Sequence, residues 1–364
     1  MEVYFENQDK ILYADLVVFL GLILILVFTF YRPYYENSLG GISSIDIYRA
    51  SILSIFLGIS VFLIIVFSVG GLSDLLSMAE LLRSGDKEIS TGILFHFAKL
   101  LLPASLVLYS TILEGKRKVV LFLLSFIFSM LLLASLAGRA IIVIYISSFI
   151  YLKFIKNGKI YIKYSFTFIV ISVFFILYGD YLFNILYGGA GVGVKTKILL
   201  EGGAYILVQD ILREFTFPYV NLLFAIEDVS GIFSFYPLEV AKGVFNLLPL
   251  GTLGLSNVDT LSNVNTIKYG TEGQIPVDLL SFGYYSMGVI GVLVFVSIIC
   301  VIYKSFDEQM YSSSSYAHYS LHSVVACKLC FVVMYSDMEQ FITGNFYIII
   351  FMFICFMFKE ARRS

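Results

Sequence analysis

The chain of 364 residues is 59% hydrophobic and only 14% charged, and its mean hydropathy is +0.91. A soluble domain carries roughly 25% charged residues, so this composition excludes an ordinary soluble protein and predicts an integral membrane protein. The formal net charge of −2 argues against a nucleic-acid partner, and we expect none.

The apolar residues come in continuous blocks, unlike the short alternating segments of a membrane β-barrel. Because crossing about 30 Å of hydrocarbon takes around 20 helical residues, we expect an all-α, polytopic fold. The whole chain, 1–364, then forms a single membrane domain. Nine spans are predicted, at 11–31, 50–70, 92–113, 119–137, 140–155, 164–183, 279–303, 318–335 and 345–358.

The distribution of Lys and Arg predicts which ends of these spans face the cytoplasm, because short cytoplasmic loops carry an excess of positive charge. The main basic clusters lie at 116–118, 153–163 and 359–363. With these inside, 13 of the 24 Lys and Arg residues are cytoplasmic and four lie in short outer segments. The N-terminus is then outside and the C-terminus inside.

One long hydrophilic region, 184–278, lies outside the membrane in this topology. It holds four of the six prolines, and loops of such length usually have a function. Apolar residues recur at near-helical spacing over Tyr205–Ile226, which predicts an amphipathic helix on the outer surface. Gly231–Leu250 is a second, partly helical stretch. The polar face of the first would hold Gln209, Asp210, Arg213 and Glu214.

Two arginines on the outer side are candidate anion-binding residues, because the planar guanidinium fits phosphate oxygens. Arg139 lies at the tip of the hairpin between the fourth and fifth spans, and Arg213 lies in the long loop. An interfacial anchor for Arg139 and a salt-bridged surface helix for Arg213 are the alternatives. Within spans, Lys99 and Asp15 are candidate ion-path residues. Candidate general bases outside are Asp210, Glu214, Glu227, Asp228, Glu239, Asp259, Glu272 and Asp278.

A zinc site is a weaker possibility near the C-terminus. His318 and His322 lie four residues apart on one helix face and precede Cys327 and Cys330. Ordinary zinc motifs do not use this spacing, so small residues packed within a membrane helix are the favoured interpretation. The chain also has no Walker loop, no Rossmann fingerprint and no Gly-x-Ser-x-Gly motif. Any reaction must draw on the substrate's own activated bond, and we expect no cofactor and no metal.

Three stretches together resemble the Wzy-type polymerases, which join the repeat units of bacterial surface polysaccharides such as O-antigen and capsule. Ser135–Ala140 is similar to the family's Ser-Gly-Ser-Arg-Gly segment at the outer end of a span, with Gly138 in place of its second serine and Ala140 in place of its last glycine. Ile211–Phe215 is similar to an arginine-containing stretch of the large outer loop. Gln274–Gly291 is similar to the return from that loop into the membrane.

This resemblance implies a glycosyltransferase of the bacterial cytoplasmic (inner) membrane, with its active site on the extracytoplasmic side. It would move a growing glycan from undecaprenyl diphosphate onto the next lipid-linked repeat unit. Arg139, Arg213 and Glu214 are the expected catalytic residues, with the arginines on the diphosphate, and one of the outer carboxylates would assist the acceptor hydroxyl as a base. The expected partners are the undecaprenyl-diphosphate-linked oligosaccharide, membrane lipid, and chain-length regulator and flippase proteins.

Two alternatives stay open at this point. A lipid-linked oligosaccharide transporter, or flippase, typically shows internal repeats, broken helices and charges at the membrane midplane. We find no repeat in this sequence. The related O-antigen ligases rely on a histidine in the outer loop, and this chain has no histidine between His96 and His318.

Overall fold

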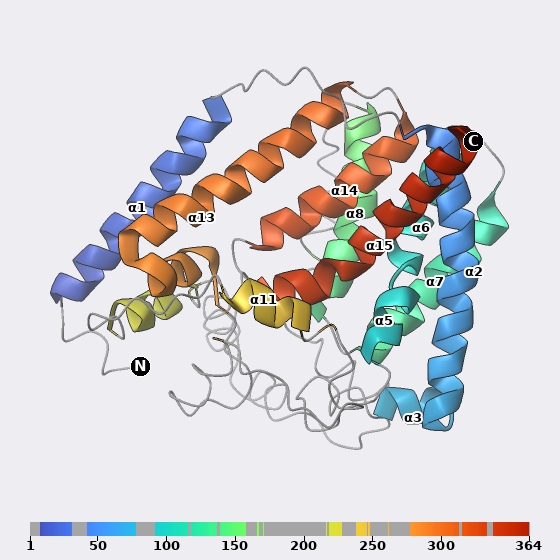
Figure 1. Ribbon diagram of the computed structural model, residues 1–364, viewed down its shortest axis with the longest axis horizontal. Helices are drawn as coiled ribbons and strands as arrows, with labels where there is room; N and C mark the ends of the chain where they lie inside the picture. Colours follow the sequence, from blue (N-terminus) through green and yellow to red (C-terminus); the bar gives the residue numbers. More distant parts are fainter. Residues whose placement is uncertain are drawn as a thin grey trace.

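The computed structural model is all-helical throughout the residues that it describes (Figure 1). Apart from a few single positions, these are 8–30, 42–77, 92–115, 118–136, 139–157, 218–227, 238–245, 277–312, 315–332 and 338–363. The helices are α1 (Gln8–Phe30), α2 (Ser44–Val69), α3 (Leu72–Ser77), α5 (Gly92–Ala98), α6 (Leu101–Leu113), α7 (Val119–Ser135), α8 (Arg139–Asn157), α11 (Leu238–Phe245), α13 (Leu279–Ser312), α14 (Tyr316–Val332) and α15 (Met338–Arg363).

The multi-span helical architecture predicted from the sequence is confirmed. Five helical stretches in the described part are long and apolar enough to cross a membrane: Asp9–Phe28, Ser44–Val69, Leu94–Leu113, Leu279–Ser305 and Gly344–Arg362. Two shorter apolar helices follow the third of them, at Val119–Ser135 and Ile141–Ile155. The count of nine spans stays a prediction, and the span expected at 164–183 lies almost entirely outside the described residues.

The second span begins at Ser44 rather than near residue 50 because a capping box starts the helix early. The Ser43 hydroxyl accepts from the backbone N–H of Asp46 at 3.3 Å, and the Asp46 carboxylate accepts from the backbone N–H of Ser43 at 3.0 Å. These bonds satisfy two N–H groups that a helix start leaves open. Arg362 of α15 adds an ion pair to Asp46 at 3.3 Å, which ties the end of the last helix to the start of α2.

The α13 helix is broken one-quarter of the way along, at Met287 and Gly288. Gly288 has φ +60° and ψ −144°, a backbone conformation that only glycine adopts readily. The break folds the first two turns back onto the rest of the helix. Gly283 then meets Gly291 and Val292 so closely that a Cβ on either glycine would overlap neighbouring backbone.

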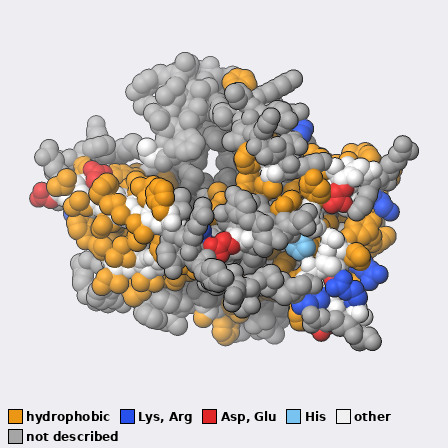
Figure 2. All heavy atoms as spheres, turned by 90° about the horizontal axis from the view of Figure 1, so that it is seen from above, with side chains coloured by type: hydrophobic (Ala, Val, Ile, Leu, Met, Phe, Trp, Pro, Cys, Tyr) orange, Lys and Arg blue, Asp and Glu red, His pale blue; other side chains and the backbone are white. Residues whose placement is uncertain are grey.

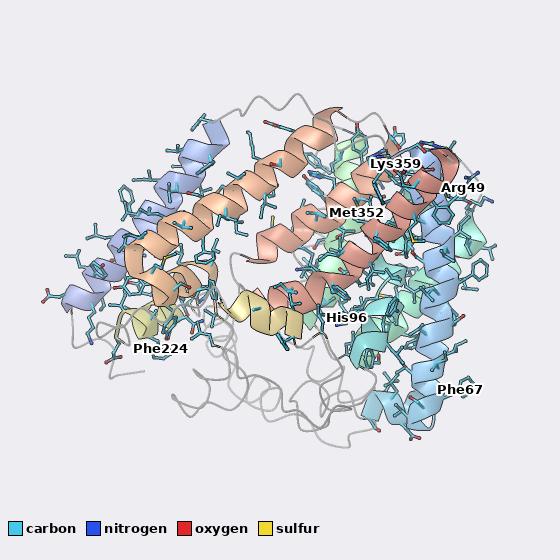
Figure 3. The ribbon with its side chains drawn as sticks, viewed as in Figure 1. Arg49, Phe67, His96, Phe224, Met352 and Lys359 are labelled. Carbon is cyan, nitrogen blue, oxygen red and sulfur yellow. The ribbon has the colours of Figure 1, made fainter. Side chains whose placement is uncertain are left out.

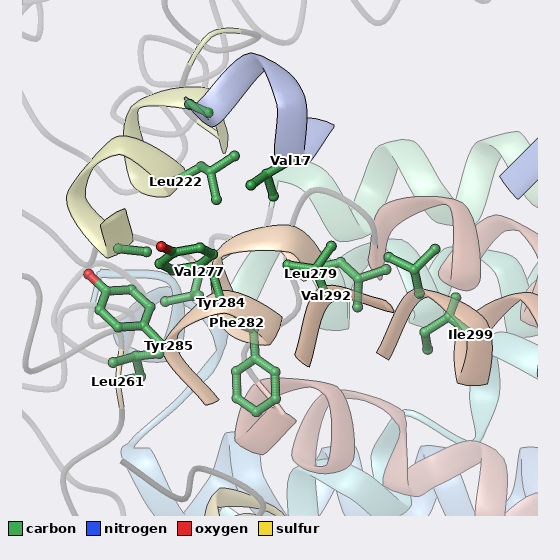
Figure 4. Close-up of a cluster of buried hydrophobic side chains, with 13 residues drawn as sticks. Val17, Leu222, Leu261, Val277, Leu279, Phe282, Tyr284, Tyr285, Val292 and Ile299 are labelled. Atoms are coloured by element: carbon green, nitrogen blue, oxygen red, sulfur yellow. The ribbon is translucent and has the colours of Figure 1, made fainter. Parts of the chain in front are cut away.

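The helices pack into two adjoining groups. In the first, α1 runs beside α13, and the helix at 218–227 lies across both (Figure 1). Their shared core includes Val17, Leu222 and Phe282 (Figure 4). In the second group, α2, α5 to α8, α14 and α15 surround three further apolar clusters, and α14 contacts α13 to join the groups.

Residues 218–227 are helical and form the described end of the stretch Tyr205–Ile226, whose helical pattern is interrupted at Pro218 in the sequence. Leu222 and Ala225 are buried, whereas Glu227 is exposed and pairs with Lys10 of α1 at 3.4 Å. The Tyr219 hydroxyl donates to the Asp15 carboxylate at 2.8 Å. Burial and this neighbouring carboxylate raise the pKa of Tyr219 to about 12, so its hydroxyl stays protonated and keeps donating.

The two ends of the molecule differ in charge. At the end where α2 begins and α15 stops lie Arg49, Lys118, Lys359 and Arg362 (Figure 3). Figure 2 looks onto this end and shows Lys and Arg side chains gathered on one side of it. We refer to it as the basic end. The opposite end holds the starts of α1, α8, α13 and α15 together with α3, α11 and the helix at 218–227 (Figure 1).

Candidate functional site

Of the three catalytic residues expected from the sequence, the structure positions one. Arg139 is the first residue of α8, directly after the short connection from α7, and it lies at the end opposite the basic end. Only its backbone belongs to the described part of the chain. Arg213 and Glu214 lie outside the described residues, so their approach to Arg139 stays a prediction.

Lys99 lies at a break within the third span, between α5 and α6. The break has a local cause. Pro103 has no N–H with which to continue the helical ladder to the carbonyl of Lys99, four residues earlier. That carbonyl instead accepts from the N–H of Leu102 at 3.0 Å, which tightens the chain into a turn. The turn brings the Lys99 side chain, which is partly buried, into the helix bundle.

Lys328 of α14 faces the same region from the other side. Its Nζ lies 5.8 Å from the ring centroid of Tyr347 in α15, close enough for a cation–π contact. The neighbouring Phe346 ring lies edge-on to the ring of His96, with centroids 5.6 Å apart. His96 precedes Lys99 by one helical turn, and the charge of Lys99 acts directly on Lys328. Helix α5, the α5–α6 turn and helix α14 thus bring His96, Lys99 and Lys328 into one region, and we call this set the interior lysine cluster.

No carboxylate in the described part of the chain pairs with Lys99 or Lys328. Other basic residues behave differently, because Lys10 pairs with Glu227 and Arg362 pairs with Asp46. Ionisable groups inside a membrane bundle are costly and usually find a partner, a water-filled cavity or a ligand. The interior lysine cluster therefore has the chemistry of an anion site.

Arg139 lies at nearly the same depth in the bundle as Lys99. Short connections make α6, α7 and α8 alternate in direction, so α6 and α8 run the same way. The hydroxyls of Ser105 in α6 and Tyr145 in α8 are hydrogen-bonded at 2.7 Å, which sets the register of the two helices. Lys99 and Arg139 each lie six residues before these partners, and a helix rises about 1.5 Å per residue.

Asp278, one of the candidate bases, has a structural role. Its carboxylate accepts from the backbone N–H groups of Leu280 and Ser281 at 2.9 and 3.0 Å and from the Ser281 hydroxyl, so it caps the start of α13. The side chain is fully buried, and this burial raises the pKa of Asp278 to about 6, against the lowering effect of its hydrogen bonds. Of the other candidates, Glu227 pairs with Lys10.

Both histidines of the zinc hypothesis have other partners in the structure. His318 Nε2 lies 2.9 Å from the carbonyl oxygen of Ile42, and the His322 ring stacks on Tyr151 with centroids 6.1 Å apart. The thiol of Cys327 lies near Ser148 of α8. In the described part of the chain, no three His, Cys, Asp or Glu side chains gather as metal ligands.

No protein-family model, curated protein or solved structure matches this chain. Sequence reasoning found Arg139 and Lys99 but gave no role to Lys328, although a lysine inside a predicted span was a usable signal. What joins Lys328 to Lys99 is the packing of α14 between α6 and α8, which no local pattern records.

Proposed function

We propose that this protein is a polysaccharide repeat-unit polymerase that transfers a growing glycan from undecaprenyl diphosphate onto the next lipid-linked repeat unit. One observation carries the proposal. Three basic residues, Arg139, Lys99 and Lys328, lie at a similar depth in the bundle, nearer the end opposite the basic end. An anionic headgroup carried on a membrane lipid fits such a region, since its lipid tail can stay in the bilayer.

The charge difference between the two ends supports an outer location for this region. Under the positive-inside rule the basic end, with Arg49, Lys118, Lys359 and Arg362, faces the cytoplasm. Arg139 and the start of α13 then face outward, as does the loop at 184–278. Lipid-linked repeat units are polymerised on that side in the family that the sequence resembles.

The reaction needs only the substrate's own activated bond. A hydroxyl of the acceptor repeat unit attacks the anomeric carbon of the donor glycan, and the bond from that carbon to the diphosphate oxygen breaks. The lipid diphosphate leaves with the bonding electrons, and the hydroxyl proton passes to a base, for which Glu214 is our candidate. Cationic side chains lower the barrier because they stabilise the charge that develops on the leaving diphosphate.

A lipid-linked oligosaccharide flippase is the second candidate, and two features favour it. The break at Met287 and Gly288 in α13 and the charged Lys99 and Lys328 inside the bundle are both typical of transporters. The polymerase remains our first choice because the topology predicted from the sequence puts the loop at 184–278 and Arg139 on the same side of the membrane. A transporter has no need of a large extramembrane region on one side.

Gene deletion and complementation in the source bacterium separate the two candidates. A cell that lacks its polymerase displays glycans of one repeat unit, whereas a cell that lacks its flippase displays none. We expect single-repeat glycans in the deletion strain and a restored ladder of chain lengths with the wild-type gene. Complete loss of surface glycan in the deletion strain, with lipid-linked repeat units accumulating inside, would overturn the polymerase proposal in favour of the flippase.

A further inference from the structure

The interior lysine cluster brings two basic side chains together without a carboxylate partner among the described residues. Lys99 and Lys328 come from different helices, both are partly buried, and the charge of one acts on the other. Two ammonium groups in a medium of low dielectric constant repel each other far more than in water. In the described part of the chain no carboxylate offsets this repulsion, so the arrangement is stable only with an anion between the helices or with a lost proton.

The surroundings of the pair hold its donors in place. The face of the Tyr347 ring holds Lys328 by a cation–π contact, and Tyr347 itself is only 2% exposed and therefore fixed. His96 Nδ1 is buried and has no hydrogen-bond partner among the described residues. The two ammonium groups and the imidazole nitrogen come from the α5–α6 turn, α14 and α5. A ligand with several anionic oxygens has enough acceptors for all of these groups.

We propose that Lys99 and Lys328, with His96 beside them, bind the diphosphate group of a polyprenyl-linked molecule. The anion chemistry follows from the cluster alone, and the identification of the lipid rests on the proposed function. The cluster lies inside the bundle at about the depth of Arg139 and not on the solvent-exposed surface. This position suits a headgroup whose lipid tail stays in the bilayer.

Titration of the purified protein in detergent with farnesyl diphosphate tests the site, with inorganic pyrophosphate as a second probe. We expect Lys99→Gln and Lys328→Gln each to weaken farnesyl diphosphate binding at least about tenfold, the loss typical of one hydrogen bond to a charged group. Weak binding of pyrophosphate beside tight binding of farnesyl diphosphate identifies a lipid headgroup as the source. Equal binding of both probes identifies free diphosphate, and it would overturn the lipid assignment.

Lys359→Gln is the matched control, because Lys359 is also buried beside an aromatic ring, 5.5 Å from the centroid of Phe356, but lies at the basic end. It should bind farnesyl diphosphate as the wild type does. The ligand-free Lys99→Gln and Lys328→Gln proteins should be at least as heat-stable as the wild type, since each variant removes one of two repelling charges. Lys99→Met and Lys328→Met keep the aliphatic stems and replace any glutamine variant that fails to fold.

Unchanged binding in either lysine variant would overturn the site, as would a variant that is less stable but still binds normally. The proposed diphosphate site and the proposed polymerase function can be rejected independently of each other. Diphosphate binding without chain extension rejects the polymerase and keeps the site. Chain extension by a protein whose lysine variants bind normally rejects the site and keeps the polymerase.

Discussion

At the scale of single residues, Arg139 lies at the end of its helix where a positive charge is least favourable. Arg139 begins α8, where the helix dipole is already positive, so its own helix gives the guanidinium no stabilisation. The same location favours an anion, because the first N–H groups of the helix and the arginine can bind it together.

Arg139→Ala should lower the rate of chain extension about a hundredfold, because removing one donor to a developing anion typically costs about 3 kcal/mol. Arg139→Lys keeps the charge but loses the planar fork, so it should fall between the alanine variant and the wild type. Arg49→Ala, at the basic end, is the control and should extend chains normally. The measurement is the initial rate with purified lipid-linked repeat units. Normal rates in Arg139→Ala would leave this arginine as an anchor.

The buried carboxyl group of Asp278 should make the free energy of unfolding depend on pH. Burial raises its pKa from 3.8 to about 6, so the folded state holds the proton more tightly than the unfolded state. The stabilisation is therefore fully present below pH 4 and is lost as the pH rises through 6, by about 3 kcal/mol in all. Asp278→Asn keeps a capping oxygen but cannot ionise. The melting temperature of the wild type should fall relative to that of Asp278→Asn between pH 4 and 6.5. Parallel curves would contradict this assignment.

At the scale of helices, much of the structure could be predicted from the sequence. The helices α1, α7, α8 and α14 begin or end within a few residues of the predicted spans, because long apolar runs in a bilayer leave few alternatives to helix. The early start of α2 was missed because it depends on the pairing of Ser43 with Asp46, which lies before the apolar run. The break in the third span was missed too, although Pro103 gave a local signal.

The close contact of the two arms of α13 depends on glycine. In Gly291→Ala the new methyl group would overlap the carbonyl of Gly283, so the arms must separate. We expect a loss of about 1–3 kcal/mol in the free energy of unfolding, the usual cost of overpacking. Gly344→Ala is the control, because its Cβ would meet no atom within 4 Å and alanine favours the helix. Thermal unfolding in detergent should give a lower melting temperature for the first variant and an equal or higher one for the second. The opposite order would show that this contact does not hold α13 together.

At the scale of the whole molecule, the charge difference between its ends defines a topology that labelling can test. Lys10 and Lys118 both lie among the described residues, at opposite ends of the bundle. An impermeant thiol reagent applied to intact cells should label Lys10→Cys and Asn257→Cys and should spare Lys118→Cys. Unsubstituted protein reports the background from the four native cysteines. The reverse labelling pattern would place Arg139 and the interior lysine cluster towards the cytoplasm.

Only part of the candidate site could be predicted from the sequence. Arg139 was found because one charge between two apolar runs is visible locally, and Lys99 because it interrupts a span. Lys328 becomes a candidate only because α14 packs between α6 and α8. This packing brings Lys328 near Lys99, which is more than two hundred positions away in the sequence. Arg213 and Glu214 rest on the sequence alone, since they lie outside the described residues.

The central claim is that this chain alone joins lipid-linked repeat units. The most direct test incubates the purified protein in detergent with undecaprenyl-diphosphate-linked repeat units and no nucleotide sugar, and resolves the products by gel electrophoresis and mass spectrometry. We predict a ladder of glycans whose steps differ by one repeat unit. One undecaprenyl diphosphate should be released for each repeat unit that is joined. Substrate that stays as single repeat units, with protein shown to be folded and to bind farnesyl diphosphate, would contradict the claim.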